Sequence, residues 1–434
     1  MKELDHNSKN YSGEEWIGDV PTNWDVKPLF TLFRNIQNKN IGNLENNVLS
    51  LSYGKIVRRD IESNYGLLPE SFETYQIVEP NDIILRLTDL QNDKKSLRVG
   101  LVEERGIITS AYVSLRPGNK LLPRYAYYLL HNYDISKIFY NLGSGVRQSM
   151  NYVDLKKLTF LVPPLMEQSR IVVYLDSEIS KINLLISKKK KLVELLQEKR
   201  QAFITEAVTK GLAKNVPMKD SGIEWLGNVP AHWRISKFKY ISKLTSGGTP
   251  KRNNNVDYFE NGDIDWVRTL DLTEDSVFDT SEKLTEEALM NSNCKMLPVN
   301  TLLIAMYGGG GTIGKSGILE IESTTNQAIA SILPNEKYFY PRYLLRVLNF
   351  LRPHWMIYAE GSRKDPNINL DVVANMPLPL PPINEQKKIS LFLEKKLISL
   401  ANIELKIIKQ IKQLQEYRQS LISEAVTGKI DIGE

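Results

Sequence analysis

One stretch in the second half of the chain has the residue types and spacing of a phosphate-binding loop. Gly309 is followed by four residues and then by Gly314, Lys315 and Ser316, just after the apolar run 302–306. In nucleotide hydrolases such a loop cradles phosphates and opens onto a helix whose N-terminal amides face them. Here the residues after Ser316 alternate in polarity with a period of two. This alternation predicts a strand and disfavours nucleotide hydrolysis.

Other residues that could carry chemistry do not cluster in the sequence. The single cysteine, Cys294, cannot form an internal disulfide, and the four histidines lie far apart without a cysteine or paired carboxylate at ligand spacing. We therefore predict no catalytic residue, no metal site and no cofactor in this chain. The histidines are His6, His131, His232 and His354.

Length and composition are those of an ordinary globular protein. The chain has 434 residues, 42% of them hydrophobic and 25% charged, which leaves room for about three domain-sized units. The net charge of +5 permits a nucleic-acid partner without requiring one. Neither a secretory leader nor a run of about 18 apolar residues is present in this sequence. We expect a soluble, cytoplasmic protein that does not contact a membrane.

The chain contains an internal duplication. Residues 11–29, YSGEEWIGDVPTNWDVKPL, return as 220–238, DSGIEWLGNVPAHWRISKF. A Pro-Pro-x-x-Glu-Gln stretch and a Glu-Ala-Val-Thr stretch also recur, at an offset of 218 residues. Each half therefore has the same order: a Trp-Pro opening, a variable body, a Pro-Pro stop, a long uninterrupted segment and an EAVT ending. Repeats of this kind predict two copies of one structural plan.

The uninterrupted segments predict two long helices. From each Pro-Pro stop to Ala207 or Ala425 no proline or glycine intervenes, which corresponds to roughly 60 Å of helix at 1.5 Å per residue. The positions of a mostly apolar seam alternate in steps of four and three in both segments, so we expect an antiparallel coiled coil. The seam residues are Ile182, Ile186, Lys189, Val193, Leu196, Arg200, Phe203 and Ala207 in the first helix, and Leu400, Glu404, Ile407, Ile411, Leu414, Arg418, Leu421 and Ala425 in the second.

The two bodies, roughly 20–160 and 229–378, read as mixed α/β domains. Short apolar runs such as 82–89 and 300–307 are bounded by Gly, Pro, Asn and Asp, as strands are, and a helical pattern follows in the same slot of each body. The expected fold class is α/β: two mixed α/β bodies separated by two long antiparallel helices, with a pseudo-twofold internal repeat.

Basic and polar residues recur at corresponding loops of both bodies. Such side chains on loops held by a rigid scaffold suit phosphate oxygens and base edges, so we predict that they bind nucleic acid. The candidate nucleic-acid-binding residues are Lys55, Arg58, Arg59, Lys94, Lys95, Arg98, Arg147 and Gln148 in the first half, and Lys251, Arg252, Lys315, Ser316, Arg363 and Lys364 in the second.

Several stretches together resemble the specificity subunits of type I restriction-modification systems. They are GEEWIGDVP and GIEWLGNVP, SGGTP with YFENGDIDW, MYGGGGTIGKSG with TTNQA, and the two PPxxEQ helices that end in EAVT. The resemblance implies two target recognition domains, each reading half of a bipartite double-stranded DNA site, and spacer helices that dock two methyltransferase subunits and restriction subunits. It implies domain boundaries at 1–160 and 212–378 for the recognition domains, and at 161–211 and 379–434 for the spacers.

Two other interpretations remain open from the sequence. A nucleotide-binding protein would depend on 309–316 alone, and a non-catalytic coiled-coil adaptor would leave the basic loops of two large, unlike bodies unexplained. Because the sequence contains no Asn-Pro-Pro-aromatic methylation motif, no glycine-rich cofactor fingerprint and no nuclease carboxylate cluster, we expect methylation and cleavage to reside in partner subunits.

Overall fold

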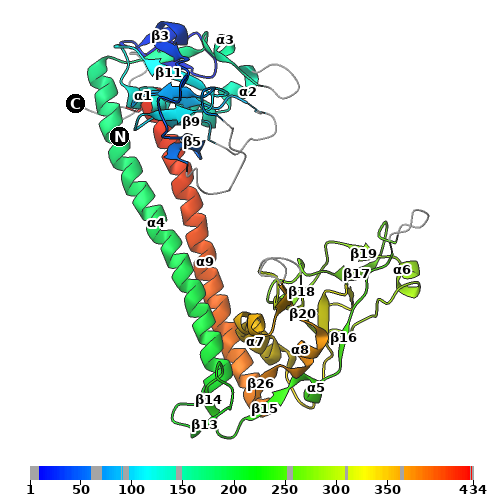
Figure 1. Ribbon diagram of the computed structural model, residues 1–434. Helices are drawn as coiled ribbons and strands as arrows, with labels where there is room; N and C mark the ends of the chain where they lie inside the picture. Colours follow the sequence, from blue (N-terminus) through cyan, green and yellow to red (C-terminus); the bar gives the residue numbers. More distant parts are fainter. Residues whose placement is uncertain are drawn as a thin grey trace. The chain divides into compact units, whose positions relative to one another are not determined.

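Two compact units make up the chain. The structure, a computed structural model, describes residues 9–59, 71–88, 90, 97–142, 149–251, 258–307, 311–361, 366–430 and 432. Unit 1 comprises Met1–Lys190 with Ile408–Glu434, and unit 2 comprises Lys191–Ile407. Each unit holds one body together with part of the long helix α4 (Leu165–Lys210) and part of the long helix α9 (Ile383–Val426) (Figure 1). The four domain boundaries given above stay predictions.

The two long helices begin and end where the sequence predicts. Each starts directly after a Pro-Pro pair and carries a glutamate, Glu167 or Glu385, in its first turn. Beyond the last turn, Gly211 and Gly428 adopt positive φ angles of 74° and 67°. Glycine accepts this left-handed conformation without steric cost, which lets the chain leave the helix end.

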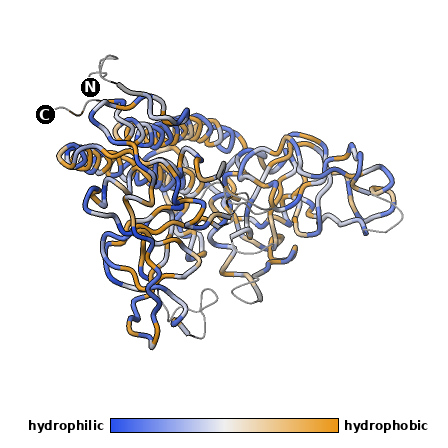
Figure 2. The backbone as a smooth tube through the Cα atoms, turned by 90° about the horizontal axis from the view of Figure 1, so that it is seen from above, coloured by the Kyte–Doolittle hydropathy of each residue, from blue (hydrophilic) through white to orange (hydrophobic). Residues whose placement is uncertain are grey.

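Burial along α4 and α9 follows the predicted seam. Ile182 and Ile186 are buried while Leu184 and Leu185 between them are exposed, and Figure 2 shows hydrophobic and hydrophilic residues alternating along both helices. In unit 1, Asn183 bonds Arg418 and Lys189 bonds Gln410; in unit 2, Gln197 bonds Glu404 and Phe203 lies 5.9 Å from Lys396 Nζ. In each unit, the residue number of the α9 partner falls as that of the α4 partner rises. The two helix segments of each unit therefore run antiparallel. The coiled coil itself stays a prediction.

The main sheet of unit 1 has four antiparallel strands in the order β4-β11-β8-β9. Helix α1 contacts β9 and β11 and so covers one face of this sheet. The core beneath it also takes Leu421, Ile422, Ala425 and Val426 from the end of α9. The elements are β4 (Phe33–Ile36), β8 (Ile83–Leu85), β9 (Val99–Leu101), β11 (Val113–Pro117) and α1 (Pro123–Ile135).

Unit 2 repeats this plan with one strand more. Its sheet has the order β16-β23-β20-β21-β18, in which the first four strands pair antiparallel and β18 pairs parallel with β21. Helix α7 contacts β20 and β21, as α1 contacts its sheet in unit 1. The predicted pair of mixed α/β bodies is thus confirmed. The elements are β16 (Leu244–Ser246), β18 (Ser276–Val277), β20 (Leu302–Ala305), β21 (Ser316–Leu319), β23 (Ile329–Ile332) and α7 (Pro341–Leu351).

Smaller elements complete both units. Unit 1 also contains β1 (Lys9–Tyr11), β2 (Asp19–Pro21), β3 (Asp25–Pro28), η2 (Leu29–Thr31), β5 (Leu49–Ser52), β6 (Lys55–Arg58), β7 (Gln76–Val78), β10 (Gly106–Ile108), α2 (Ile138–Leu142), α3 (Tyr152–Leu155) and β12 (Thr159–Val162). Unit 2 also contains β13 (Met218–Asp220), β14 (Asn228–Pro230), β15 (Arg234–Lys237), α5 (Phe238–Ile241), β17 (Ile264–Val267), β19 (Lys283–Leu284), α6 (Glu286–Met290), β22 (Thr324–Thr325), η3 (Arg352–Ile357), β24 (Glu360–Gly361), β25 (Pro366–Asn367), α8 (Leu370–Asn375) and β26 (Pro377–Leu380).

A buried glutamine ties the start of each long helix to the start of the short helix beside it. Gln168 donates to the carbonyls of Lys120 and Pro163, at 2.9 and 2.8 Å, and accepts from the amide of Leu122 at 2.8 Å. Leu122 is the N-cap of α1, so the glutamine fixes α1 against α4. In unit 2 Gln386 makes the same three bonds, with Tyr338, Pro381 and Tyr340 as partners. The repeated Glu-Gln stretch therefore has a structural task.

The helices of the described chain are too short or too polar to cross a lipid bilayer.

Candidate nucleic-acid interface

In unit 1 the hairpin of β5 and β6 presents the first group of predicted contacts. Tyr53 and Gly54 form its two-residue turn with φ angles of 47° and 78°, the left-handed pair that fits the strand twist. Tyr53 is 83% exposed, and Lys55 beside it is exposed and forms no ion pair with any described residue. Arg58 is exposed but donates to Glu104 from Nε, at 2.7 and 2.9 Å, and also from Nη2, and Arg59 is half-buried. Lys55 is thus the best placed of the three cations for an incoming anion.

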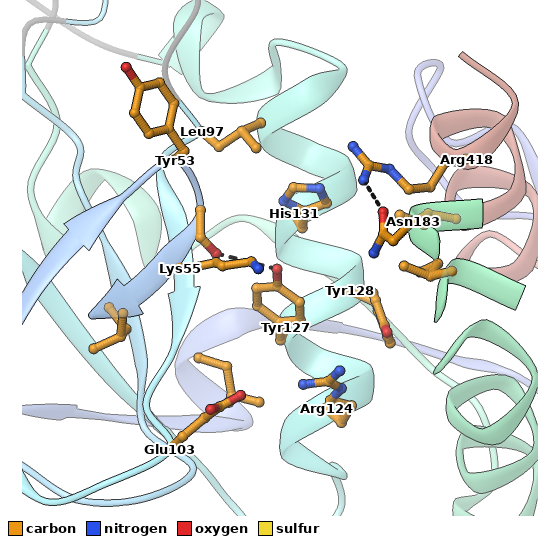
Figure 3. A pocket seen from close by; sticks show the side chains of 15 residues that line it. Tyr53, Lys55, Leu97, Glu103, Arg124, Tyr127, Tyr128, His131, Asn183 and Arg418 are labelled. Atoms are coloured by element: carbon orange, nitrogen blue, oxygen red, sulfur yellow. Dashed lines mark hydrogen bonds between the residues drawn. The ribbon is translucent and has the colours of Figure 1, made fainter. Parts of the chain in front are cut away.

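A cavity of about 390 Å³ lies between this hairpin, α1 and the long helices of unit 1 (Figure 3). Arg124 on α1 donates to Asp176 of α4 at 3.0 Å, and Tyr128 donates to the same carboxylate. On the other side Arg418 of α9 donates to the amide oxygen of Asn183 at 2.6 Å. Tyr127 closes the wall toward the hairpin, where its hydroxyl donates to Gly54 at 3.4 Å.

Burial sets the protonation of the cavity wall. His131 stacks on Tyr127 with ring centroids 5.7 Å apart, and its Nδ1 has no hydrogen-bond partner among the described residues. Burial, helped by the charge of Arg418, lowers the pKa of His131 to about 4, so the ring is neutral at pH 7. Burial and the bond to Asp176 raise the pKa of Tyr128, which therefore stays protonated. The cations of this cavity at neutral pH are Lys55, Arg124 and Arg418.

Arg98 is not the exposed contact that the sequence predicts. Its side chain is fully buried, and its guanidinium donates to the carbonyls of Arg86 and Thr88, at 3.2 and 2.8 Å, and to the hydroxyl of Tyr140 at 3.2 Å. A buried guanidinium needs such acceptors to offset its lost hydration. Arg98 therefore holds the approach to β9 in place and is unavailable to DNA in this conformation.

In unit 2 the glycine-rich stretch joins two antiparallel strands, β20 and β21, and does not open onto a helix. Gly314 has a φ of +72°, and a Cβ built on it would lie 2.3 Å from Cδ1 of Trp355. Ser316 is fully buried, and its hydroxyl accepts from Asn349 at 3.1 Å, so the predicted contact of Ser316 with DNA is wrong for this conformation. Lys315 is half-buried at the loop end. This strand–loop–strand geometry does not favour the nucleotide-binding alternative.

Unit 2 contains a cavity of about 610 Å³ that is lined almost wholly by polar residues and glycine. Gly247 packs so closely on β22 that a Cβ there would lie 1.8 Å from the carbonyl oxygen of Thr325, and Gly248 donates to that oxygen at 2.9 Å. This contact sets Thr249 beside Gln327, to which it donates a hydrogen bond. The remaining lining residues are Lys251, Tyr258, Asn291, Ser292 and Asn293.

Sequence reasoning missed the amide-bearing side chains of this cavity. Asn and Gln can bond the adenine edge with two hydrogen bonds, so Asn291, Asn293 and Gln327 are candidates for base contacts. The glycines of the SGGTP stretch indicate a close backbone approach, but nothing in the sequence spacing predicts that SGGTP and TTNQA lie side by side. Of the predicted contacts, Lys251 lies at this cavity and is exposed. Lys94, Lys95, Arg147, Gln148, Arg252, Arg363 and Lys364 lie outside the described residues.

Fold and site together define a class of protein. Two bodies of one topology, each with a cavity lined by cationic or amide side chains, are combined with paired helices. Within the described ranges no group of three or more His, Cys, Asp or Glu residues is arranged to hold a metal ion. These features are those of a modular binding protein with two recognition bodies.

The comparison with known families identifies it further. A family model described as the type I restriction modification DNA specificity domain matches residues 30–195 and 230–413. The chain belongs to this family.

Individual relatives agree with that assignment. The chain is 28% identical over 160 residues to the EcoR124I/EcoR124II type I restriction enzyme specificity subunit of Escherichia coli, covering 36% of this chain and only 38% of the relative. It is 25% identical over 373 residues to the MjaVIII specificity subunit of Methanocaldococcus jannaschii, covering 82% and 80%. A solved structure from work on complex assembly and conformational transition of the type I restriction-modification system shares the fold, with a TM-score of 0.71 at 16% identity over 95% of this chain and 99% of that one.

Proposed function

We propose that the chain is the sequence-reading subunit of a cytoplasmic type I restriction-modification complex. It recognises an asymmetric, bipartite site in double-stranded DNA, with one half-site contacted by residues 20–160 and the other by 229–378. It carries no catalysis of its own. Two methyltransferase subunits and the restriction subunits bind to it and perform the reactions.

One observation carries this proposal. The two units share a topology and the buried glutamine, Gln168 or Gln386, that holds the short helix against the long one, but they differ in the side chains of their cavities. The order β4-β11-β8-β9 in unit 1 corresponds to β16-β23-β20-β21 in unit 2. The unit 1 cavity is lined by aromatic rings and cations, whereas the polar cavity of unit 2 is lined by amides and hydroxyls. A shared scaffold with different contact surfaces suits two unlike half-sites.

The lysines and the amides have different parts in this proposal. Lys55, Lys251 and Lys315 contact phosphates, which supplies affinity without sequence information. Gln327 and Asn293 contact base edges, where a bidentate pair discriminates by roughly 1–3 kcal/mol. Arg59 and the cations outside the described residues are also assigned to phosphate contacts. Arg58 must release Glu104 before it can bind a phosphate.

A body exchange tests the division of the target. The first body, residues 20–160, is replaced by that of another family member, and methylated adenines are mapped genome-wide in cells that contain each chain. The expected result is a change in one half-site with the other retained. A change in both half-sites, or the absence of any methylation that depends on the chain, contradicts the proposal.

Single substitutions test the contacts. Lys315→Ala should weaken DNA binding of the assembled methyltransferase by about 1 kcal/mol across all sequences and reduce the salt slope by about one. Gln327→Ala should instead relax the choice of one base in one half-site. Fluorescence anisotropy at several salt concentrations measures both effects, and unchanged affinity together with an unchanged slope would mean that the loop of Lys315 is scaffold only.

A further inference from the structure

Corresponding turns of the two units each expose one large apolar side chain. In unit 1, Val48 directly before β5 forms a parallel bridge with Ile107 of β10, and β5 pairs antiparallel with β6. In unit 2, β17 pairs parallel with β22 and antiparallel with β19. Because β10 precedes β11 as β22 precedes β23, β5 and β17 occupy the same place in the fold. The turn after β5 presents Tyr53, which is 83% exposed, and the turn after β17 presents Leu270, which is 76% exposed.

Tyr53 occupies its turn against the local backbone preference. Its φ of +47° is left-handed, a conformation in which a bulky side chain is an outlier. In the two-residue turn that Tyr53 forms with Gly54, asparagine is the favoured residue before glycine. The ring is almost wholly exposed, so core packing does not offset this strain. Backbone strain of this kind is found most often at binding sites, which suggests that the tyrosine serves a contact with another molecule.

Leu270 is displayed by a turn whose polar groups are bonded within the unit. The amide of Asp271 donates to the carbonyl of Arg268 at 3.0 Å, and the amide of Arg268 donates to the Asp271 carboxylate at 2.8 Å. Ser281 donates to the other oxygen of that carboxylate at 2.6 Å, and the guanidinium of Arg268 donates to Glu282 at 2.9 Å. The charged neighbours of Leu270 are thus engaged inside the unit, and the leucine side chain is what the turn offers to a partner.

Both turns lie beside proposed DNA contacts. In unit 1 Tyr53 is two residues before the exposed Lys55, and Figure 3 shows its ring pointing away from the labelled side chains of the long helices. In unit 2 the carbonyl of Val267, at the end of β17, accepts from the amide of Asn326 at 3.1 Å, so the turn begins next to Gln327. A duplex bound at Lys55 and Gln327 therefore comes within reach of both turns.

We propose that Tyr53 and Leu270 are wedges, each of which inserts between two neighbouring base pairs of one half-site and unstacks them. Apolar side chains that enter a base step in this way kink the duplex. Unstacking costs least at flexible steps such as TA and CA, so each wedge selects sequence at a step where it makes no hydrogen bond. The inference depends on the proposed function, because it concerns how the two bodies read the DNA that they bind.

Fluorescent base analogues, whose emission rises when they are unstacked, test the wedges. The assembled methyltransferase is mixed with duplexes that carry the target found by methylation mapping. In these duplexes 2-aminopurine replaces adenine or pyrrolocytosine replaces cytosine, one position at a time, the methylated adenines excepted. The wild type should raise the emission at one step in each half-site. Tyr53→Ala should abolish the rise in one half-site alone and Leu270→Ala in the other, each with a roughly tenfold loss of affinity. Tyr53→Phe and Leu270→Met should retain both rises.

A mispaired step distinguishes insertion from a contact on the outside of the duplex. A mismatch at the step concerned leaves less stacking to disrupt, so the wild type should bind that duplex more tightly and the matching alanine variant should gain nothing. Tyr53→Asn adds a readout that a purely structural role would move in the opposite direction. It should unfold at a higher urea concentration than the wild type, because the strain of the turn is relieved, and yet lose the rise in emission.

Two exposed aromatic residues away from these turns serve as controls. Tyr11→Ala and Phe278→Ala, at positions 64% and 70% exposed, should change neither emission nor affinity. A rise that persists in both alanine variants, or that disappears from both half-sites in either one, would overturn the inference. A lower urea midpoint for Tyr53→Asn would show that the tyrosine serves the fold and would overturn its assignment. A wild-type assembly that binds no duplex would instead contradict the proposed function itself.

Discussion

The two units hold the first turn of their long helices with partly different side chains. In unit 1 Glu167 accepts from the indole of Trp24 at 2.8 Å and from Asn23 at 3.0 Å. In unit 2 the corresponding Glu385 lies 2.8 Å from Nε2 of His232, and the indole nitrogen of the buried Trp233 has no partner among the described residues. The glutamine that follows each glutamate makes identical bonds in both units. The glutamine contacts are thus the same in both units, whereas the glutamate contacts differ, and in unit 2 the lost indole bond leaves a buried N–H group without a partner among the described residues.

The glutamine clamp should give the largest effect and should be equal in both units. Gln168→Leu and Gln386→Leu each leave three backbone groups without this partner, one of them buried and two partly buried, so we expect a loss of roughly 2–4 kcal/mol in the stability of the unit concerned. Urea unfolding followed by hydrogen exchange in α1 and α7 measures it. Gln201→Leu, at an exposed position of α4, should change stability little. A large effect in one unit alone would mean that the clamps are not equivalent.

The glycine loop should matter in unit 2 only. Gly314→Ala forces a side chain into a left-handed conformation against Trp355, and we expect a loss of roughly 2–3 kcal/mol. Gly311→Ala is the matched control, because its φ is +84° but nothing lies within 4 Å of its Cβ position, so only about 1 kcal/mol of strain is expected. Thermal unfolding separates the two. Equal losses would show that Trp355 moves aside.

The stability of unit 1 should depend on acid pH through one residue, His131, that unit 2 lacks at the corresponding position. His131 on α1 corresponds to Asn349 on α7, and only the histidine can take up a proton on unfolding. Because its pKa is about 4 in the folded chain against 6.5 in the unfolded one, its contribution is full above pH 6.5 and is lost as the pH falls toward 4. We expect unit 1 to lose roughly 1–2 kcal/mol in this window relative to His131→Asn.

The measurement is the difference between wild-type and variant unfolding free energies at pH 7 and pH 4.5, which cancels the carboxylates that titrate in both. His354→Asn, in unit 2, is the control, since the pKa of His354 is lowered by burial but the ring is only partly enclosed. Parallel pH profiles for wild type and His131→Asn would contradict the prediction.

Local patterns predicted the elements, because their causes are local. The heptad spacing identified which faces of α4 and α9 are buried, from Ile182 to Ala425, and the Pro-Pro pairs and glycines set the helix ends. The period of two after Ser316 correctly indicated a strand. None of these required knowledge of a distant segment.

Contacts between distant segments could not be predicted in this way. Arg98 follows a run of charged residues, so the sequence placed it at the exposed tip of a loop. In the structure it is buried and donates a hydrogen bond to Tyr140, 42 positions away. The spacing of the glycine-rich stretch made Ser316 a candidate phosphate ligand, but its hydroxyl is buried and accepts a hydrogen bond from Asn349. Gln327 meets Thr249 across 78 positions because Gly247 has no side chain to hold the strands apart. Burial of a polar side chain depends on such tertiary neighbours, and composition does not encode them.

The way in which the units divide the chain has a consequence for synthesis. Unit 2 is one continuous segment, Lys191–Ile407, whereas the core of unit 1 needs Leu421, Ile422 and Val426 from the end of α9. The body of unit 1 leaves the ribosome first but waits for more than 200 further residues, roughly 10–50 s at 5–20 residues per second, before its last core side chains arrive. During that interval its apolar surface is open to chaperones and to aggregation. The half that is made first is the half that finishes folding last.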